Sequence, residues 1–67
     1  MKAILYPVKT IDGNVEKCEL SEAQMFGVYL CNDEHEIWFA DFDTIEQGKE
    51  LTDRLNFAFN KLTELRR

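Results

Sequence analysis

The sequence predicts an α+β fold: a four-stranded antiparallel meander, made of two hairpins, with one long C-terminal helix packed on one face. Three observations lead to this prediction. Asp12-Gly13 is a strong two-residue hairpin turn, because both positions favour positive φ. Two stretches rich in β-forming residues flank the polar turn 32–35. A leucine-rich stripe with alternating spacings of three and four residues runs from Gly48 to Leu65, as on one helix face.

The first predicted hairpin joins a strand over 2–9 to a return strand over 14–20. Because Pro7 cannot donate a hydrogen bond to a ladder, we expect the first strand to lie at an edge or to be bulged there. The return strand is mostly polar, which predicts that one of its sides is exposed to water. Ser21 and Gln24 then have the spacing of a capping box and predict a single helical turn.

The second predicted hairpin joins strands over 26–31 and 37–42. A register that pairs Cys31 with Glu36 makes both faces of this hairpin apolar, since opposed residues point the same way. One face collects Phe26, Val28, Leu30, Ile37 and Phe39. The other face collects Gly27, Tyr29, Trp38, Ala40 and Phe42.

One helix can cover only one of these faces, and its leucine stripe suits the aliphatic one. Tyr29, Trp38 and Phe42 are therefore expected to be partly exposed on the far face. In the alternative, Trp38 and Phe42 wrap around the sheet edge and are covered by the first hairpin.

The predicted helix begins at Asp43-Thr44, where Thr44 and Gln47 form a capping box, and runs to about Leu65. Its stripe serves either as core or as a helix–helix dimer seam. Phe57 lies off the stripe and is expected to be exposed.

Length and charge limit the function. The 67 residues allow one domain, 1–67, and the 45% hydrophobic content excludes disorder by composition. Lys and Arg number 8 against 13 Asp and Glu, for a net charge of −5. No basic residue occurs between Lys17 and Lys49. We therefore expect no direct nucleic-acid binding, and a negative field that attracts basic partners.

The protein is predicted to be cytoplasmic. The apolar run after Met1-Lys2 is too short for a secretory signal, and no stretch is long enough to cross a membrane. Cys18 and Cys31 are therefore expected to be reduced thiols.

No catalytic motif is present, which predicts a protein that is not an enzyme and uses no cofactor. Two sets of side chains are candidate metal ligands: Asp41, Asp43 and Glu46 in one, and Cys18, Cys31 and His35 in the other. The first set is explained by a helix start, and the second lacks the usual zinc spacing. A carboxylate metal-binding module is kept as an alternative.

The segment 36–56 contains Ala40-Asp41-Phe42-Asp43-Thr44 at the end of a strand, followed by an amphipathic helix. This pattern resembles small phage and bacterial proteins, a class that includes anti-CRISPR and other anti-defence inhibitors. The resemblance implies a compact acidic phage protein that inhibits a host protein. It carries no catalytic residues.

The sequence therefore predicts a small acidic phage-type binding protein that inhibits or modulates a host protein, such as a nucleic-acid-binding protein with a basic groove. A structural homo-oligomer that uses the aromatic sheet face is the alternative, and we expect a homo-oligomer, such as a dimer, in either case. The candidate aromatic anchors are Tyr29, Trp38, Phe42 and Phe57. The candidate charged footprint is Asp33, Glu34, Glu36, Asp41 and Asp43.

Overall fold

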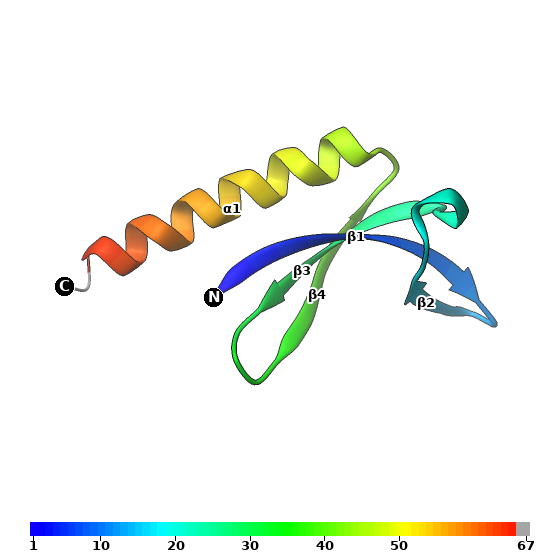
Figure 1. Ribbon diagram of the computed structural model, residues 1–67, viewed down its shortest axis with the longest axis horizontal. Helices are drawn as coiled ribbons and strands as arrows, with labels where there is room; N and C mark the ends of the chain where they lie inside the picture. Colours follow the sequence, from blue (N-terminus) through cyan, green and yellow to red (C-terminus); the bar gives the residue numbers. More distant parts are fainter. Residues whose placement is uncertain (66–67) are drawn as a thin grey trace.

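A computed structural model describes residues 1–65 and has the predicted α+β architecture, an antiparallel sheet with one long helix (Figure 1). Its elements are β1 (Lys2–Ile11), β2 (Asn14–Lys17), the 3-10 turn η1 (Leu20–Glu22), β3 (Met25–Cys31), β4 (Glu36–Phe42) and α1 (Ile45–Leu65). Within this described part of the chain, no helix has the length and apolarity needed to cross a bilayer.

The strand order is β2-β1-β3-β4, so the two predicted hairpins form but do not follow one another as a simple meander. β1 lies inside the sheet and pairs antiparallel with both β2 and β3. The expected edge position of the first strand is therefore wrong. Pro7 is tolerated because β2 ends opposite Val8, and the Pro7 carbonyl accepts from the Cys18 N–H at 3.0 Å. The Pro7 nitrogen then faces the same side, just past the last β2 pair.

Local signals around the first hairpin are mostly confirmed. Asp12 and Gly13 have φ values of 51° and 82°, as a tight two-residue turn requires. A single helical turn also forms, but Glu19 rather than Ser21 precedes it, and no side chain caps it. Gln24 ties the connection between β2 and β3 to β1. Its N–H donates to the Val8 carbonyl at 2.9 Å, and its side chain accepts from the Thr10 N–H at 3.0 Å.

The helix begins as predicted, with the Thr44 hydroxyl accepting from the Gln47 N–H at 3.3 Å. It approaches β1 closely at Gly48, where an added Cβ would lie 2.6 Å from a Leu5 methyl carbon. Two turns later the Asn56 side chain accepts from the Ala3 N–H at 2.7 Å and donates to the Ala3 carbonyl at 3.0 Å. Asn56 thereby replaces the strand that β1 lacks beyond the end of β2.

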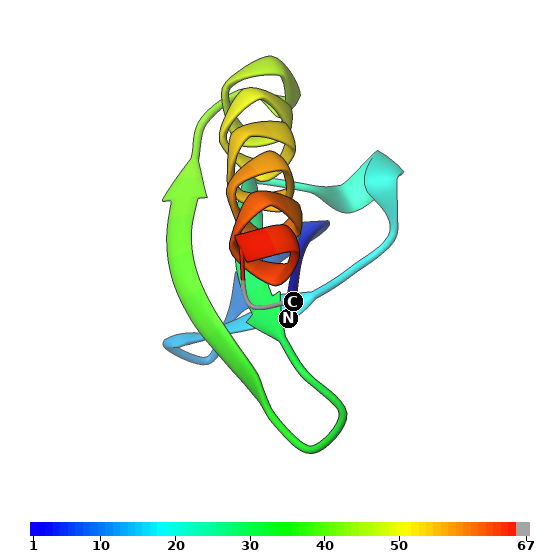
Figure 2. The same cartoon turned by 90° about the vertical axis from the view of Figure 1, so that its left-hand side faces the viewer.

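The core is small: the buried apolar residues are Ala3, Val8, Val28 and Cys31. The leucine stripe contributes to it only in its first half, where Leu51 and Leu55 are half-buried. Leu62 and Leu65 are 54% and 82% exposed. Figures 1 and 2 show the reason, since the second half of α1 runs on past the start of β1.

The β3–β4 register begins as predicted and then shifts. Tyr29 pairs with Trp38 as expected, but Val28 pairs with Ala40, so Phe39 is an extra residue in β4. Beyond this bulge, β4 presents the opposite face. Phe42 lies directly opposite Phe26 on the helix side of the sheet, and the prediction that it shares a face with Tyr29 and Trp38 is wrong.

Candidate functional site: a concave aromatic and acidic face

The face of the sheet opposite α1 is concave, because the ends of the strands bend away from the helix (Figure 1). β2 and β4 are the two edges of the sheet, and three strand spacings would separate them by about 14 Å if it were flat. The Lys17 ammonium on β2 nonetheless forms a hydrogen-bonded ion pair with Glu36 on β4. The residues we call the concave face are Tyr6, Val15, Lys17, Gly27, Tyr29, Cys31, Glu36, Trp38 and Asp41.

Lys17 lies in an aromatic and acidic setting at the centre of this face. Its Nζ is 4.0 Å from the centroid of the Tyr6 ring and 5.1 Å from that of Tyr29. The two rings meet edge to face, with centroids 5.5 Å apart. The hydrogen bond to Glu36 raises the pKa of Lys17 and lowers the pKa of Glu36. The concave face thus holds one cation by two ring faces and a carboxylate.

Cys31 lies beside the ion pair of Lys17 and Glu36. Its thiol donates to the second Glu36 oxygen over 3.4 Å. Burial and the neighbouring carboxylate raise the pKa of Cys31. The thiol therefore stays protonated at neutral pH, which makes it a poor nucleophile.

Trp38 and Asp41 form the rim on β4. The indole N–H donates to one Asp41 carboxylate oxygen at 2.9 Å, which fixes the ring although Trp38 is 56% exposed. Together with Val15 and Tyr29, these two residues line an open cleft of about 420 Å³. Burial and the charge of Asp41 raise the pKa of Tyr29. The cleft thus joins aromatic walls to a carboxylate.

Gly27 on β3 lies close to two of the side chains that line this cleft. An added Cβ would lie 2.9 Å from a Tyr29 ring carbon and 3.0 Å from an Asp41 carboxylate oxygen. A glycine at this position therefore allows the Tyr29 ring and the Asp41 side chain to close over the strand.

The structure brings four of the predicted partner-binding residues together: Tyr29, Glu36, Trp38 and Asp41. The bulge is what places Asp41 there, since it lies opposite Gly27. The first hairpin does not bury Trp38, which is 56% exposed, although Val15 of that hairpin lines the same cleft.

The other predicted residues lie elsewhere. Asp33 and Glu34 are exposed in the β3–β4 turn, and Asp43 is exposed in the turn before α1. Phe57 is exposed on α1 with the Lys61 ammonium 5.4 Å from its ring centroid. Phe42 lines a shallow hollow against α1.

Sequence reasoning missed the contributions of Tyr6, Val15 and Lys17. The alternation of side chains along β1 and β2 puts these three residues on one face. Only the curl of the sheet brings that face close to the residues of β4.

Neither of the two candidate sets of metal ligands is assembled. Within residues 1–65, no three His, Cys, Asp or Glu side chains lie close enough together to hold a metal ion. Cys18 and Cys31 are free thiols.

Comparison of the chain with protein-family models, with curated proteins and with solved structures finds no match in any of the three.

Proposed function

We propose that this chain is a non-enzymatic cytosolic protein that binds a host protein and inhibits or modulates it, as do the anti-defence phage proteins that residues 36–56 resemble. The observation that carries the proposal is Trp38, which is more than half exposed yet held in one orientation by Asp41. Exposed aromatic side chains with restricted motion are typical anchors of protein interfaces, because binding orders them at little entropic cost.

The chemistry of the concave face favours a basic partner. Lys17 shows how this face accommodates an ammonium group, between two tyrosine rings and a carboxylate. The neighbouring cleft offers the same combination through Tyr29, Trp38 and Asp41, and it opens to solvent. An arginine or lysine side chain of the partner suits this cleft, because it meets both a ring face and a negative charge.

The charge of the whole chain supports the same class of partner. A net charge of −5 attracts a basic surface and speeds the encounter with it. A nucleic-acid-binding protein has such a surface in its groove. Occupation of that groove would inhibit it by excluding the nucleic acid.

The proposal is tested by affinity capture from host-cell lysate, followed by binding measurements on the captured protein. Trp38→Ala and Asp41→Asn remove the ring and the charge of the cleft. Phe57→Ala removes an exposed aromatic from α1 and is the matched control. We expect both cleft variants to weaken binding at least about tenfold and the control to bind normally.

A defined probe complements the capture experiment. Trp38 is the only tryptophan of the chain, so its fluorescence reports directly on the cleft. Titration with an arginine-rich peptide should change that fluorescence, whereas a glutamate-rich peptide of equal length should not. Equal capture by the wild type and both cleft variants would contradict the proposed surface.

A further inference from the structure

We infer that a second copy of this chain packs against the side of the molecule opposite the concave face, on an apolar surface at the free end of α1. This helix-side patch consists of Met1, Ile37, Phe59, Leu62 and Leu65. It differs from the aromatic sheet face considered from the sequence. It does not depend on the proposed function, because the two surfaces lie on opposite sides of the sheet.

The patch arises because α1 is longer than the sheet beneath it. A helix of 21 residues spans about 31 Å, and Asn56 already reaches Ala3 near the start of β1. The leucine stripe then continues for more than two turns without strands to cover it. Phe59 and Leu62 therefore present apolar surface outward.

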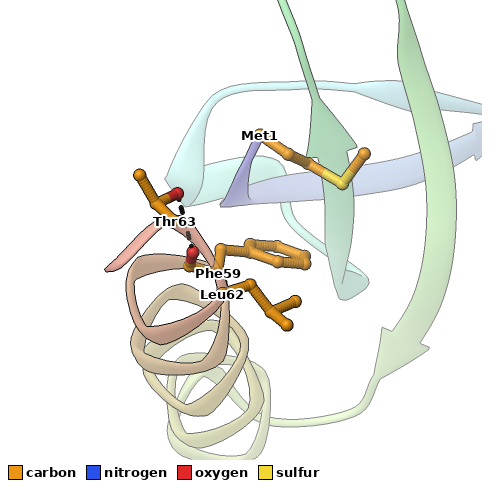
Figure 3. Close-up of a pocket in the computed structure, with 4 residues that line it drawn as sticks. All are labelled: Met1, Phe59, Leu62 and Thr63. Carbon is orange, nitrogen blue, oxygen red and sulfur yellow. Dashed lines mark hydrogen bonds between the residues drawn. The ribbon is translucent and has the colours of Figure 1, made fainter. Parts of the chain in front are cut away.

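Figure 3 shows how these side chains gather. Met1, Phe59 and Leu62 surround a hollow of about 220 Å³ at the end of α1. The Thr63 hydroxyl donates to the Phe59 carbonyl at 3.0 Å, so the polar group at this rim is satisfied within the helix. Apart from that of Thr63, the side chains that line the hollow are apolar.

Ile37 adds apolar surface on the same side of the sheet. It pairs with Leu30, which pairs with the buried Ala3, so Ile37 points to the helix side. It is nevertheless 62% exposed, because α1 does not reach β4 at this level.

The exposed surface area of the chain indicates how much area a second copy would cover. Folded monomers of 7.9 kDa expose about 4,400 Å². This chain exposes 5204 Å². The excess over the whole surface, roughly 800 Å², is similar to the area that one partner contributes to an interface of standard size. Its radius of gyration of 13.2 Å exceeds the roughly 11 Å of a compact domain of this length, which agrees with an open shape.

The composition of the patch favours a second copy over a different protein. Interfaces of homodimers are more apolar than those of transient complexes, and no side chain of the patch is charged. A two-fold arrangement lets the free end of each helix cover the hollow of the other copy, so both copies bury the same surface. The concave face, with its charged groups, stays free for another partner.

The test is sedimentation velocity of the full chain over about 1–200 μM, with circular dichroism to check folding. The matched variants are Leu62→Glu in the patch and Leu20→Glu in η1, where the leucine is 63% exposed. The wild type and Leu20→Glu should sediment as dimers, with twice the 7.9 kDa mass of one chain. Leu62→Glu should weaken dimerisation at least about 100-fold, because symmetry places the substitution in the interface twice.

Two further variants decide the remaining outcomes. Leu65→Glu changes an 82% exposed residue at the helix end, so it should dissociate the dimer even if Leu62→Glu impairs folding. Trp38→Ala should remain a dimer. The inference is overturned if the wild type is monomeric throughout, if Leu65→Glu stays as dimeric as the wild type, or if Trp38→Ala alone dissociates the dimer.

Discussion

The clearest test of how the helix is held to the sheet is the substitution Asn56→Ala. This change removes both hydrogen bonds between the Asn56 side chain and the backbone of Ala3. Ala3 is buried, so its N–H and carbonyl then lose their partners in a place where water has little access. The helix itself should not suffer, because alanine is a better helix former than asparagine.

The magnitude follows from the two bonds. A net contribution of about 1 kcal/mol per hydrogen bond predicts a loss of roughly 2 kcal/mol in the free energy of unfolding. For a domain of this size, 1 kcal/mol corresponds to about 4–8 °C in melting temperature. Asn56→Ala should therefore lower the melting temperature by about 8–16 °C. This is a large share of the 3–5 kcal/mol that a core of this size supplies.

The assay is thermal and guanidinium unfolding followed by circular dichroism at one protein concentration. Asn60→Ala is the matched control, because Asn60 is exposed on the same helix and any gain in helix propensity is shared. Asn56→Asp keeps the acceptor for the Ala3 N–H and should lose about half as much stability as Asn56→Ala. If Asn56→Ala and Asn60→Ala unfold at the same temperature, the reasoning is refuted.

Three further predictions concern the concave face. Gly27→Ala should weaken capture of a basic partner and lower the free energy of unfolding by about 1–3 kcal/mol, because the added Cβ displaces the Tyr29 ring. Unchanged stability and binding would contradict the close approach of Tyr29 to Gly27. Glu36→Gln should lower the melting temperature at pH 7, and the difference from wild type should vanish on acidification. Cys31 should react with iodoacetamide at pH 8 more slowly in the folded than in the unfolded chain, because burial raises its pKa; equal rates would contradict this.

The sign of the pH effect follows from the direction of the pKa shift. The hydrogen bond from Lys17 lowers the pKa of Glu36 in the folded chain. The stabilisation is then fully present above the ordinary glutamate value of about 4.3 and is lost as the pH falls through the lowered value. Melting curves of wild type and Glu36→Gln should therefore converge below about pH 4. A difference that persists at pH 2 would show that the charge of Glu36 is not its cause.

The two surfaces suggest a division of roles. If two copies pair through the helix-side patch, their concave faces point outward, and one dimer presents two of them. Binding of a partner with two basic segments would then gain from the linkage of the two sites. This consequence rests on both proposals, whereas each of their tests stands alone.

Local signals in the sequence were sufficient for most of the elements. Asp12-Gly13 requires positive φ at both positions, and Thr44 caps the helix with the spacing that its backbone demands. The beginning of the β3–β4 register was also predictable, because the polar turn fixes which residues pair first. These features depend on interactions between residues that are close along the chain.

The candidate site could be predicted only in part. Tyr29 and Trp38 share a face because they pair close to the turn, before the bulge. Asp41 and Phe42 exchange faces because Phe39 is inserted into β4, and no signal in the sequence marks where a ladder takes up an extra residue.

By itself, the sequence determined the α+β class, the four strands, the long helix and the acidic charge. These follow from turn chemistry, side-chain periodicity and composition. Only the tertiary structure decided that β1 lies inside the sheet, that its curl brings Lys17 to Glu36, and that half of the leucine stripe has no strand beneath it. Each of these depends on how segments distant in the chain meet. Because α1 is longer than the sheet beneath it, apolar surface stays uncovered at the free end of α1 as well as on the concave face.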